Sequence, residues 1–207
     1  DIPQSMGAVM VAGYNNWERI DQHRRRWQQS APPDTWDDEF KRLIPQKALY
    51  QDRFIVVSAG PYSNVAASDI ILGDEEWQRL SVEIRIIHEC THYAMKRIYG
   101  QMRNNLQDEI IADAMGLVSA TGAFRSDWFL RFMGLENHHA PRPDGRIHVY
   151  RGDPPLSEAA FQILQTMLIQ ASRKIEALFP LGSDAQAACT CIMEQLATAT
   201  LESLSGS

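Results

Sequence analysis

His88-Glu89-Cys90-Thr91-His92 stands in a stretch whose apolar side chains recur at the three- and four-residue steps of an α-helix. These apolar residues are Trp77, Leu80, Ile84, Ile87, Met95 and Ile98. Residues four apart share a helix face, with Cβ atoms about 5–6 Å apart, so His88 and His92 can each give one ring nitrogen to the same metal ion. Glu89 lies one residue further round, where the general base for a metal-bound water has to be. The stretch therefore predicts a helix that carries part of a hydrolytic metal site.

A second helix is predicted downstream of Gly100, with an N-cap at Asn104-Asn105. In this helix Glu109 and Asp113 are four residues apart and share a face. A hairpin of the two helices can bring that face onto the histidines. Glu109 would then supply a third, oxygen ligand. Asp113 would accept the N–H of one ligand histidine and so fix its tautomer and orientation.

The two segments together resemble the gluzincin metallopeptidases, the thermolysin-like and related groups, whose pattern is H-E-x-x-H followed by E-x-x-x-D. The resemblance covers residues 88–113. It implies one zinc ion per chain, held by His88, His92 and Glu109, with Glu89 as the base and peptide hydrolysis as the reaction. It also implies a zincin-like domain with a small β-sheet before the H-E-x-x-H helix. One edge of such a sheet commonly aligns the substrate backbone by strand addition.

Composition limits the class of protein. The chain has 207 residues, 44% of them hydrophobic and 22% charged, which is typical of one soluble globular domain. Its net charge of −6 gives no general attraction to nucleic acid or anionic membrane, and no apolar run has the length of a membrane span. Cys90, Cys189 and Cys191 make no disulfide framework, so we expect a reducing, cytoplasmic compartment. No signal peptide is visible, although a start at Asp1 leaves a processed, secreted form open.

The pattern of elements predicts an α+β, predominantly helical, zincin-like domain over residues 1–207. Its catalytic core would span residues 53–122, with the sheet and both metal-binding helices. A C-terminal helical pair over residues 155–205 would pack on this core or serve self-association.

Two extended pieces are expected to form the small sheet. The clearer strand is formed by residues 54–57. The second piece covers residues 62–72 and ends at Gly73-Asp74, where the long helix begins. Residues 63–66 offer an edge that could align a substrate, and an ordinary core hairpin is the alternative interpretation.

Two clusters of basic or imidazole side chains are interpreted structurally. The basic run His23-Arg24-Arg25-Arg26 lies on a helix that Asn15 or Asn16 would cap. A solvated helix face is favoured there over a phosphate or nucleic-acid patch, because the chain is acidic. His138-His139 is interpreted as a surface pair rather than a second metal site, because no acidic partner has suitable spacing.

Residues 136–155 form one long irregular stretch, and such loops in a compact domain are often functional. Within it, residues 146–150 alternate like a short strand, which would put His148 and Tyr150 on one face. We expect one of these two to donate a hydrogen bond to the oxyanion of the reaction. Tyr150 is favoured because a neutral phenol needs no protonation; Tyr99 is the fallback, and ordinary packing is the alternative.

The predicted function is zinc-dependent hydrolysis of peptide bonds by attack of zinc-bound water, with Glu89 passing the proton to the leaving amine. The partner is then a peptide or protein substrate whose identity the sequence does not give. Three alternatives stay open. A non-haem iron(II) oxygenase can use the same two histidines and carboxylate, although its ligands usually lie on a β-barrel. The second alternative is a regulatory protein that retains the metal for structure, although such a protein would not need a base at Glu89. The third alternative is an accidental match of the motif.

Overall fold

Helix α3 (Asp74–Tyr99) is the longest element that the computed structural model describes, with 26 residues. Gly73 precedes it in an extended conformation, and acidic side chains fill its first turn, where they complement the helix dipole. Gly100 ends the helix with a left-handed φ of 67°. Both limits agree with the helix that the sequence predicts.

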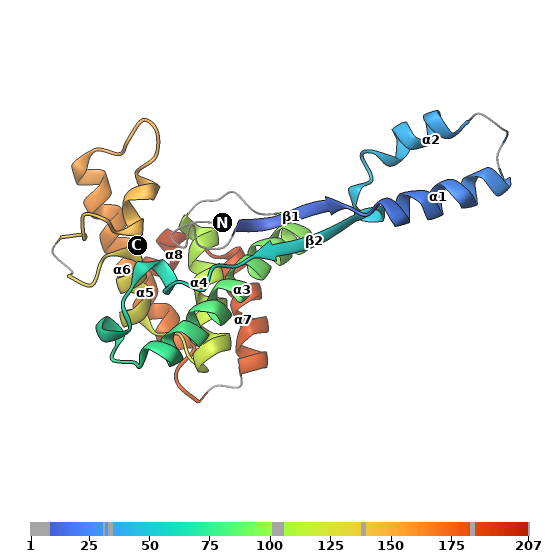
Figure 1. Cartoon of the computed structure of the whole chain (residues 1–207). Helices are drawn as coiled ribbons and strands as arrows, with labels where there is room; N and C mark the ends of the chain where they lie inside the picture. The colour runs from blue at the N-terminus through green and yellow to red at the C-terminus, as the bar shows by residue number, and fades with distance from the viewer. Residues whose placement is uncertain are drawn as a thin grey trace. The chain divides into compact units, whose positions relative to one another are not determined.

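The structure describes residues 9–30, 32, 35–100, 106–137, 140–182 and 185–206. Contacts divide the chain into two compact units. Unit 1 comprises Asp1–Val9 and Val57–Ser207, and unit 2 comprises Met10–Val56. In Figure 1, unit 2 is coloured from blue to cyan, and α3 of unit 1 is green. The predicted catalytic core begins at residue 53, close to this division, but as part of one domain, and the single-domain organisation stays a prediction.

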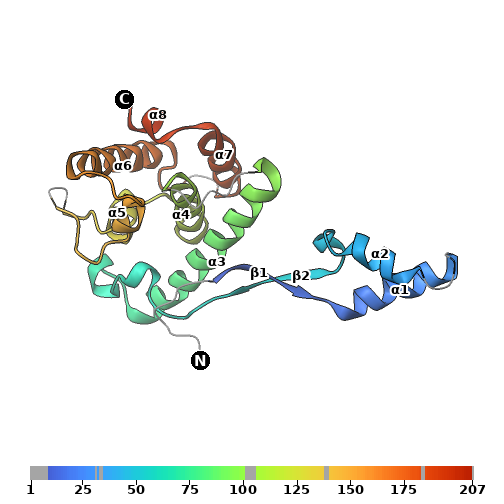
Figure 2. The same ribbon diagram turned by 90° about the horizontal axis from the view of Figure 1, so that it is seen from above.

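Helix α4 (Leu106–Thr121) lies along α3 in unit 1 (Figure 2). Gly116 allows the two backbones to approach closely, since a Cβ at this position would lie 2.9 Å from the carbonyl oxygen of Ile84. This contact holds the N-terminal half of α4, which carries Glu109 and Asp113, against the histidine face of α3. The predicted N-cap at residues 104–105 lies outside the described residues.

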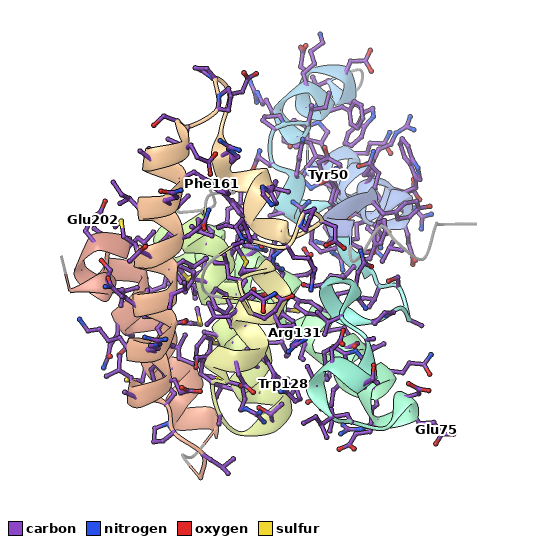
Figure 3. The ribbon with its side chains drawn as sticks, turned by 90° about the vertical axis from the view of Figure 1, so that its left-hand side faces the viewer. Tyr50, Glu75, Trp128, Arg131, Phe161 and Glu202 are labelled. Atoms are coloured by element: carbon purple, nitrogen blue, oxygen red, sulfur yellow. The ribbon has the colours of Figure 1, made fainter. Side chains whose placement is uncertain are left out.

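The described part of unit 1 contains four further α-helices: α5 (Ser126–Met133), α6 (Glu158–Leu178), α7 (Ala185–Thr198) and α8 (Leu201–Ser205). Helix α6 packs on α5 and α8, and α7 packs on α4. Trp128 of α5 and Phe161 of α6, labelled in Figure 3, are both buried in the core of this unit. The core therefore surrounds α4 with apolar side chains on several sides.

The C-terminal segment differs from the helical pair predicted over residues 155–205, because it contains three helices. The second predicted helix breaks before Thr200, whose side chain accepts the Ser203 N–H while the Ser203 hydroxyl accepts the Thr200 N–H. This capping box starts α8 as a separate helix. In the described part of the chain, every helix is too short or too polar to cross a membrane.

Unit 2 is built around a two-stranded antiparallel sheet, formed by β1 (Val9–Asn15) and β2 (Gln51–Val56). Helices α1 (Trp17–Ser30) and α2 (Trp36–Leu43) and the short 3₁₀ helix η2 (Lys47–Leu49) lie between the strands in sequence. A small apolar cluster belongs to this unit alone: Ile20, Leu43 and Tyr50, with Trp36 and Phe40 packed against them. The chain is thus mostly helical with a small sheet, which confirms the predicted α+β, predominantly helical class.

The basic run on α1 finds partners within unit 2. Asn16 caps the helix, since its side-chain oxygen accepts the Arg19 N–H at 3.1 Å. The other contacts are His23 with Glu39, Arg24 over the ring of Trp36, and Arg25 with Asp21. Three of the four side chains in the run therefore make local structural contacts, which agrees with the interpretation as a helix face.

The extended piece predicted over residues 62–72 is wrong. The chain there forms two 3₁₀ helices, η3 (Tyr62–Asn64) and η4 (Ala67–Ile70). The N–H of Val65 donates to the carbonyl of Tyr62 at 3.1 Å, so the backbone bonds to itself rather than to a neighbouring strand. Residues 63–66 therefore offer no strand edge for a substrate.

Candidate metal centre

Three potential metal ligands converge where α3 packs on α4: His88 and His92 from α3, and Glu109 from α4. The Nε2 atoms of the two histidines are 3.0 Å apart, and each lies 3.4 Å from an oxygen of Glu109. Both histidines are only 6% exposed. The group could hold a metal ion, and it consists of the ligands that the sequence analysis expects.

The spacing of these atoms fits one small cation. Ligand atoms of a tetrahedral metal ion with bonds of about 2.0–2.1 Å stand roughly 3.3 Å apart. The observed separations of 3.0 and 3.4 Å are close to this value. The Nδ1 atom of His88 faces Asp113 at 2.9 Å, so Nε2 is the atom that presents a lone pair to the cluster. The residues present therefore suit a metal ion without rearrangement of their side chains.

Glu89 lies beside the three ligands without joining them. It is 9% exposed, and burial raises the pKa of its carboxyl against the opposing influence of His88 and His92. Arg85, one turn earlier on α3, is also buried. Its guanidinium donates to the carbonyl oxygens of Ser58 and Pro61, at 2.7 and 3.2 Å. Glu89 is thus a buried carboxylate outside the group of metal ligands. The positive charge of Arg85 lies near it and acts to lower its pKa against the effect of burial.

Asp113 lies at the centre of a buried hydrogen-bond network and is itself 0% exposed. Its Oδ1 accepts from His88 Nδ1 at 2.9 Å and from the Tyr62 hydroxyl at 2.6 Å. Its Oδ2 accepts from Arg146 Nη2. Burial alone would raise the pKa of Asp113. The charge of Arg146 and these hydrogen bonds outweigh burial and hold that pKa well below its usual range. The carboxylate therefore fixes which nitrogen of His88 carries the proton.

Three residues around the metal ligands, Tyr62, Arg85 and Arg146, have no predicted role from the sequence. Arg85 has a readable signal, because it lies three residues before His88 on the same helix face, and a charged residue on a buried face needs partners. Tyr62 and Arg146 have none, because each lies in a segment that was interpreted as a strand. Their approach to Asp113 depends on tertiary contacts that a local pattern does not contain.

The strand predicted over residues 146–150 is wrong, because these residues belong to the 3₁₀ helix η5 (Arg146–Arg151). Gly145 precedes it, and the His148 N–H donates to the Gly145 carbonyl at 3.1 Å. A 3₁₀ helix has 3.0 residues per turn, so residues two apart point in different directions. His148 and Tyr150 therefore do not share a face as expected.

The structure separates the three candidates for the oxyanion donor. Tyr150 is half-buried and close to Glu109: burial and the nearby carboxylates of Glu109 and Asp113 raise the pKa of its phenol above the usual value, although Arg146 opposes them. His148 Nε2 instead donates to the carbonyl of Arg142 at 3.0 Å. Tyr99 is at the C-terminal end of α3, about two turns beyond His92, and is 37% exposed. His138 and His139 lie outside the described residues.

Fold and site together define a mostly helical protein with a buried group of two histidines and one glutamate that could hold a metal ion. The chain belongs to the family described as "Family of unknown function (DUF7005)", whose model matches residues 1–207. No curated protein and no solved structure matches the chain.

Proposed function

We propose that this protein is a zinc-dependent metallopeptidase on a zincin-like scaffold, with α3 and α4 as its metal-binding pair and a peptide or protein as its substrate. One observation carries the proposal. Two imidazoles and one carboxylate converge at ligand spacing, and a further buried carboxylate, Glu89, remains outside the ligand set. A metal site that served structure alone would have no use for that carboxylate.

The donor set favours zinc. Two histidines and one glutamate leave an open position on a four-coordinate ion, which is the arrangement of hydrolytic zinc sites. When bound there, zinc lowers the pKa of a water molecule towards about 7 and polarises the substrate carbonyl.

Each supporting residue then has a defined role. Glu89 accepts the proton of the attacking water and transfers it to the leaving amine. Asp113 holds the Nδ1 proton of His88, so that Nε2 remains a ligand. Tyr150, which burial and Glu109 keep protonated, donates a hydrogen bond to the oxygen that becomes negative in the transition state.

An iron(II) oxygenase is the second candidate, because two histidines and one carboxylate also suit iron(II). The observation that favours it is the ligand set itself. Glu89 has no evident part in that chemistry, and both ligand-bearing elements are helices. A regulatory protein that binds metal without catalysis is the remaining alternative.

The test combines metal analysis with a search for products. The purified protein is assayed for bound metal and incubated with a broad peptide library, whose products are identified by mass spectrometry. We expect zinc, cleavage that a chelator abolishes, and recovery on addition of zinc. Bound zinc with no cleavage across the library would favour the regulatory alternative, and bound iron with oxygen consumption would favour the oxygenase.

A further inference from the structure

Tyr62 occupies a position that the proposed catalytic roles leave unexplained. It is 4% exposed, and its hydroxyl lies 2.6 Å from Asp113 Oδ1 and 2.9 Å from His88 Nδ1. A phenol in an apolar core usually needs only one partner. The Tyr62 hydroxyl instead lies against both His88, a metal ligand, and Asp113, the carboxylate that orients it.

The backbone that carries Tyr62 is constrained. The two residues that follow, Ser63 and Asn64, have positive φ angles of 51° and 56°, although neither is glycine. Such conformations are uncommon and persist only where surrounding contacts impose them. The Tyr62 N–H donates to Ser81 Oγ at 3.0 Å, and the Ser63 Oγ lies 3.4 Å from Arg146 Nη1.

The ring of Tyr62 contacts side chains of two other elements, α5 and α3. It meets the ring of Phe132 on α5 edge to face, with centroids 5.0 Å apart. The guanidinium of Arg85 on α3 lies 5.5 Å from the ring centroid. The direction of the hydroxyl is therefore fixed by packing and does not depend on its hydrogen bonds alone.

The hydroxyl has one proton to donate, and the carboxylate oxygen of Asp113 is the acceptor nearest to it. The proton on His88 Nδ1 is directed to the same oxygen. Two donors on one oxygen restrict the rotation of the carboxylate that faces the imidazole. Loss of the hydroxyl would leave that oxygen with His88 as its remaining donor in the described part of the chain, and the carboxylate would be freer to turn.

We propose that Tyr62 is a positioning residue of the metal centre, which acts through Asp113 to fix the orientation of His88. The proposal rests on the metal site of the proposed function and does not depend on peptide hydrolysis. Removal of an outer hydrogen-bond partner of a metal ligand typically costs about 10–100-fold in metal affinity. Because Tyr62 acts at one step further from the metal, we expect about 10-fold, the lower end of that range.

The experiment compares Tyr62→Phe with a matched control, Tyr50→Phe. Tyr50 is also a buried tyrosine, 8% exposed, and its hydroxyl donates to the Ile44 carbonyl at 2.9 Å within unit 2, whereas the metal ligands belong to unit 1. Zinc affinity is measured by competition with a chromophoric chelator. The visible absorption of the cobalt(II)-loaded proteins reports the ligand geometry, which loss of stability alone would not change. We expect weaker zinc binding and altered cobalt bands for Tyr62→Phe, and parental values for Tyr50→Phe.

A double-mutant cycle tests the route through Asp113. In an Asp113→Asn background, Tyr62→Phe should change zinc affinity by less than about twofold, because the partner through which it acts is already altered. Parental zinc affinity and cobalt bands in Tyr62→Phe would overturn the proposal while leaving the metal site in place. A parent protein that binds no zinc or cobalt would overturn the metal site and this proposal together.

Discussion

Among the residues of the metal centre, Glu89 has a role that one substitution can isolate. Glu89→Gln keeps the size and hydrogen-bonding capacity of the side chain but cannot accept a proton. We expect the variant to bind one zinc ion per chain, to melt near the parent temperature, and to lose about 10²–10⁴-fold in peptide turnover. Zinc content, melting temperature and turnover should be measured on the same preparation.

His88→Ala is the control for Glu89→Gln, because it removes a ligand rather than the base. This variant should lose zinc and activity together. Unchanged peptide turnover in Glu89→Gln would rule out the proposed proton transfer.

Asp113→Asn tests the network that orients His88. The amide presents an N–H₂ group where the carboxylate accepts from His88, Tyr62 or Arg146, so one of these contacts becomes repulsive. We expect zinc affinity to fall by about 10–100-fold. The melting temperature should also fall, since Arg146 loses the charge of its buried partner. Equal zinc affinity in parent and variant, by chelator competition, would remove Asp113 from the site.

Tyr150 and His148 provide a contrasting pair. Tyr150→Phe should lower kcat by about 10²–10³-fold, the usual cost of removing one oxyanion donor. His148→Ala should leave kcat near the parent value, because His148 Nε2 is bonded to the Arg142 carbonyl and its ring packs on Phe161. Steady-state kinetics of both variants decide the assignment, and parental kcat in Tyr150→Phe would refute it.

At the scale of elements, the contact between α3 and α4 controls the spacing of the ligands. In Gly116→Ala the new Cβ would lie 2.9 Å from the Ile84 carbonyl oxygen and 3.0 Å from its Cγ2, so the helices must separate. Overpacking of this kind costs about 1–3 kcal/mol of unfolding free energy. The better helix propensity of alanine offsets only about 1 kcal/mol of it. We expect lower stability by denaturant titration together with weaker zinc binding. A variant as stable as the parent would show that the close contact between Gly116 and Ile84 does not require a glycine.

The helices of the site could be predicted because their signals are local. The glycines at 73 and 100 mark the ends of α3, and four-residue spacing puts His88 and His92 on one face. The contact of Glu109 with that face could be predicted because a short connection makes the two helices a hairpin. The 3₁₀ helices η3 and η5 could not be predicted, because a short apolar alternation is compatible with a strand as well as with a tight turn. The roles of Tyr62 and Arg146 were missed for this reason.

At the scale of the whole molecule, the division into two units was not predicted, because no long linker in the sequence separates unit 2 from unit 1. The apolar residues of unit 2 form their own small cluster, which becomes visible only when α1 packs on α2. The ligands and the supporting side chains described above all belong to Val57–Ser207 of unit 1. Metal binding should therefore not require unit 2.

Excision of residues 10–56 tests this independence. Because β1 and β2 are antiparallel, the start of β1 lies beside the end of β2, and a short Gly/Ser linker can replace the excised segment. The shortened chain should fold cooperatively and bind zinc within about twofold of the full chain, as expected of independent sites. The same chain with His88→Ala should bind no zinc, which separates the native site from adventitious binding. A shortened chain that folds cooperatively but binds zinc much more weakly would mean that unit 2 contributes to the metal centre.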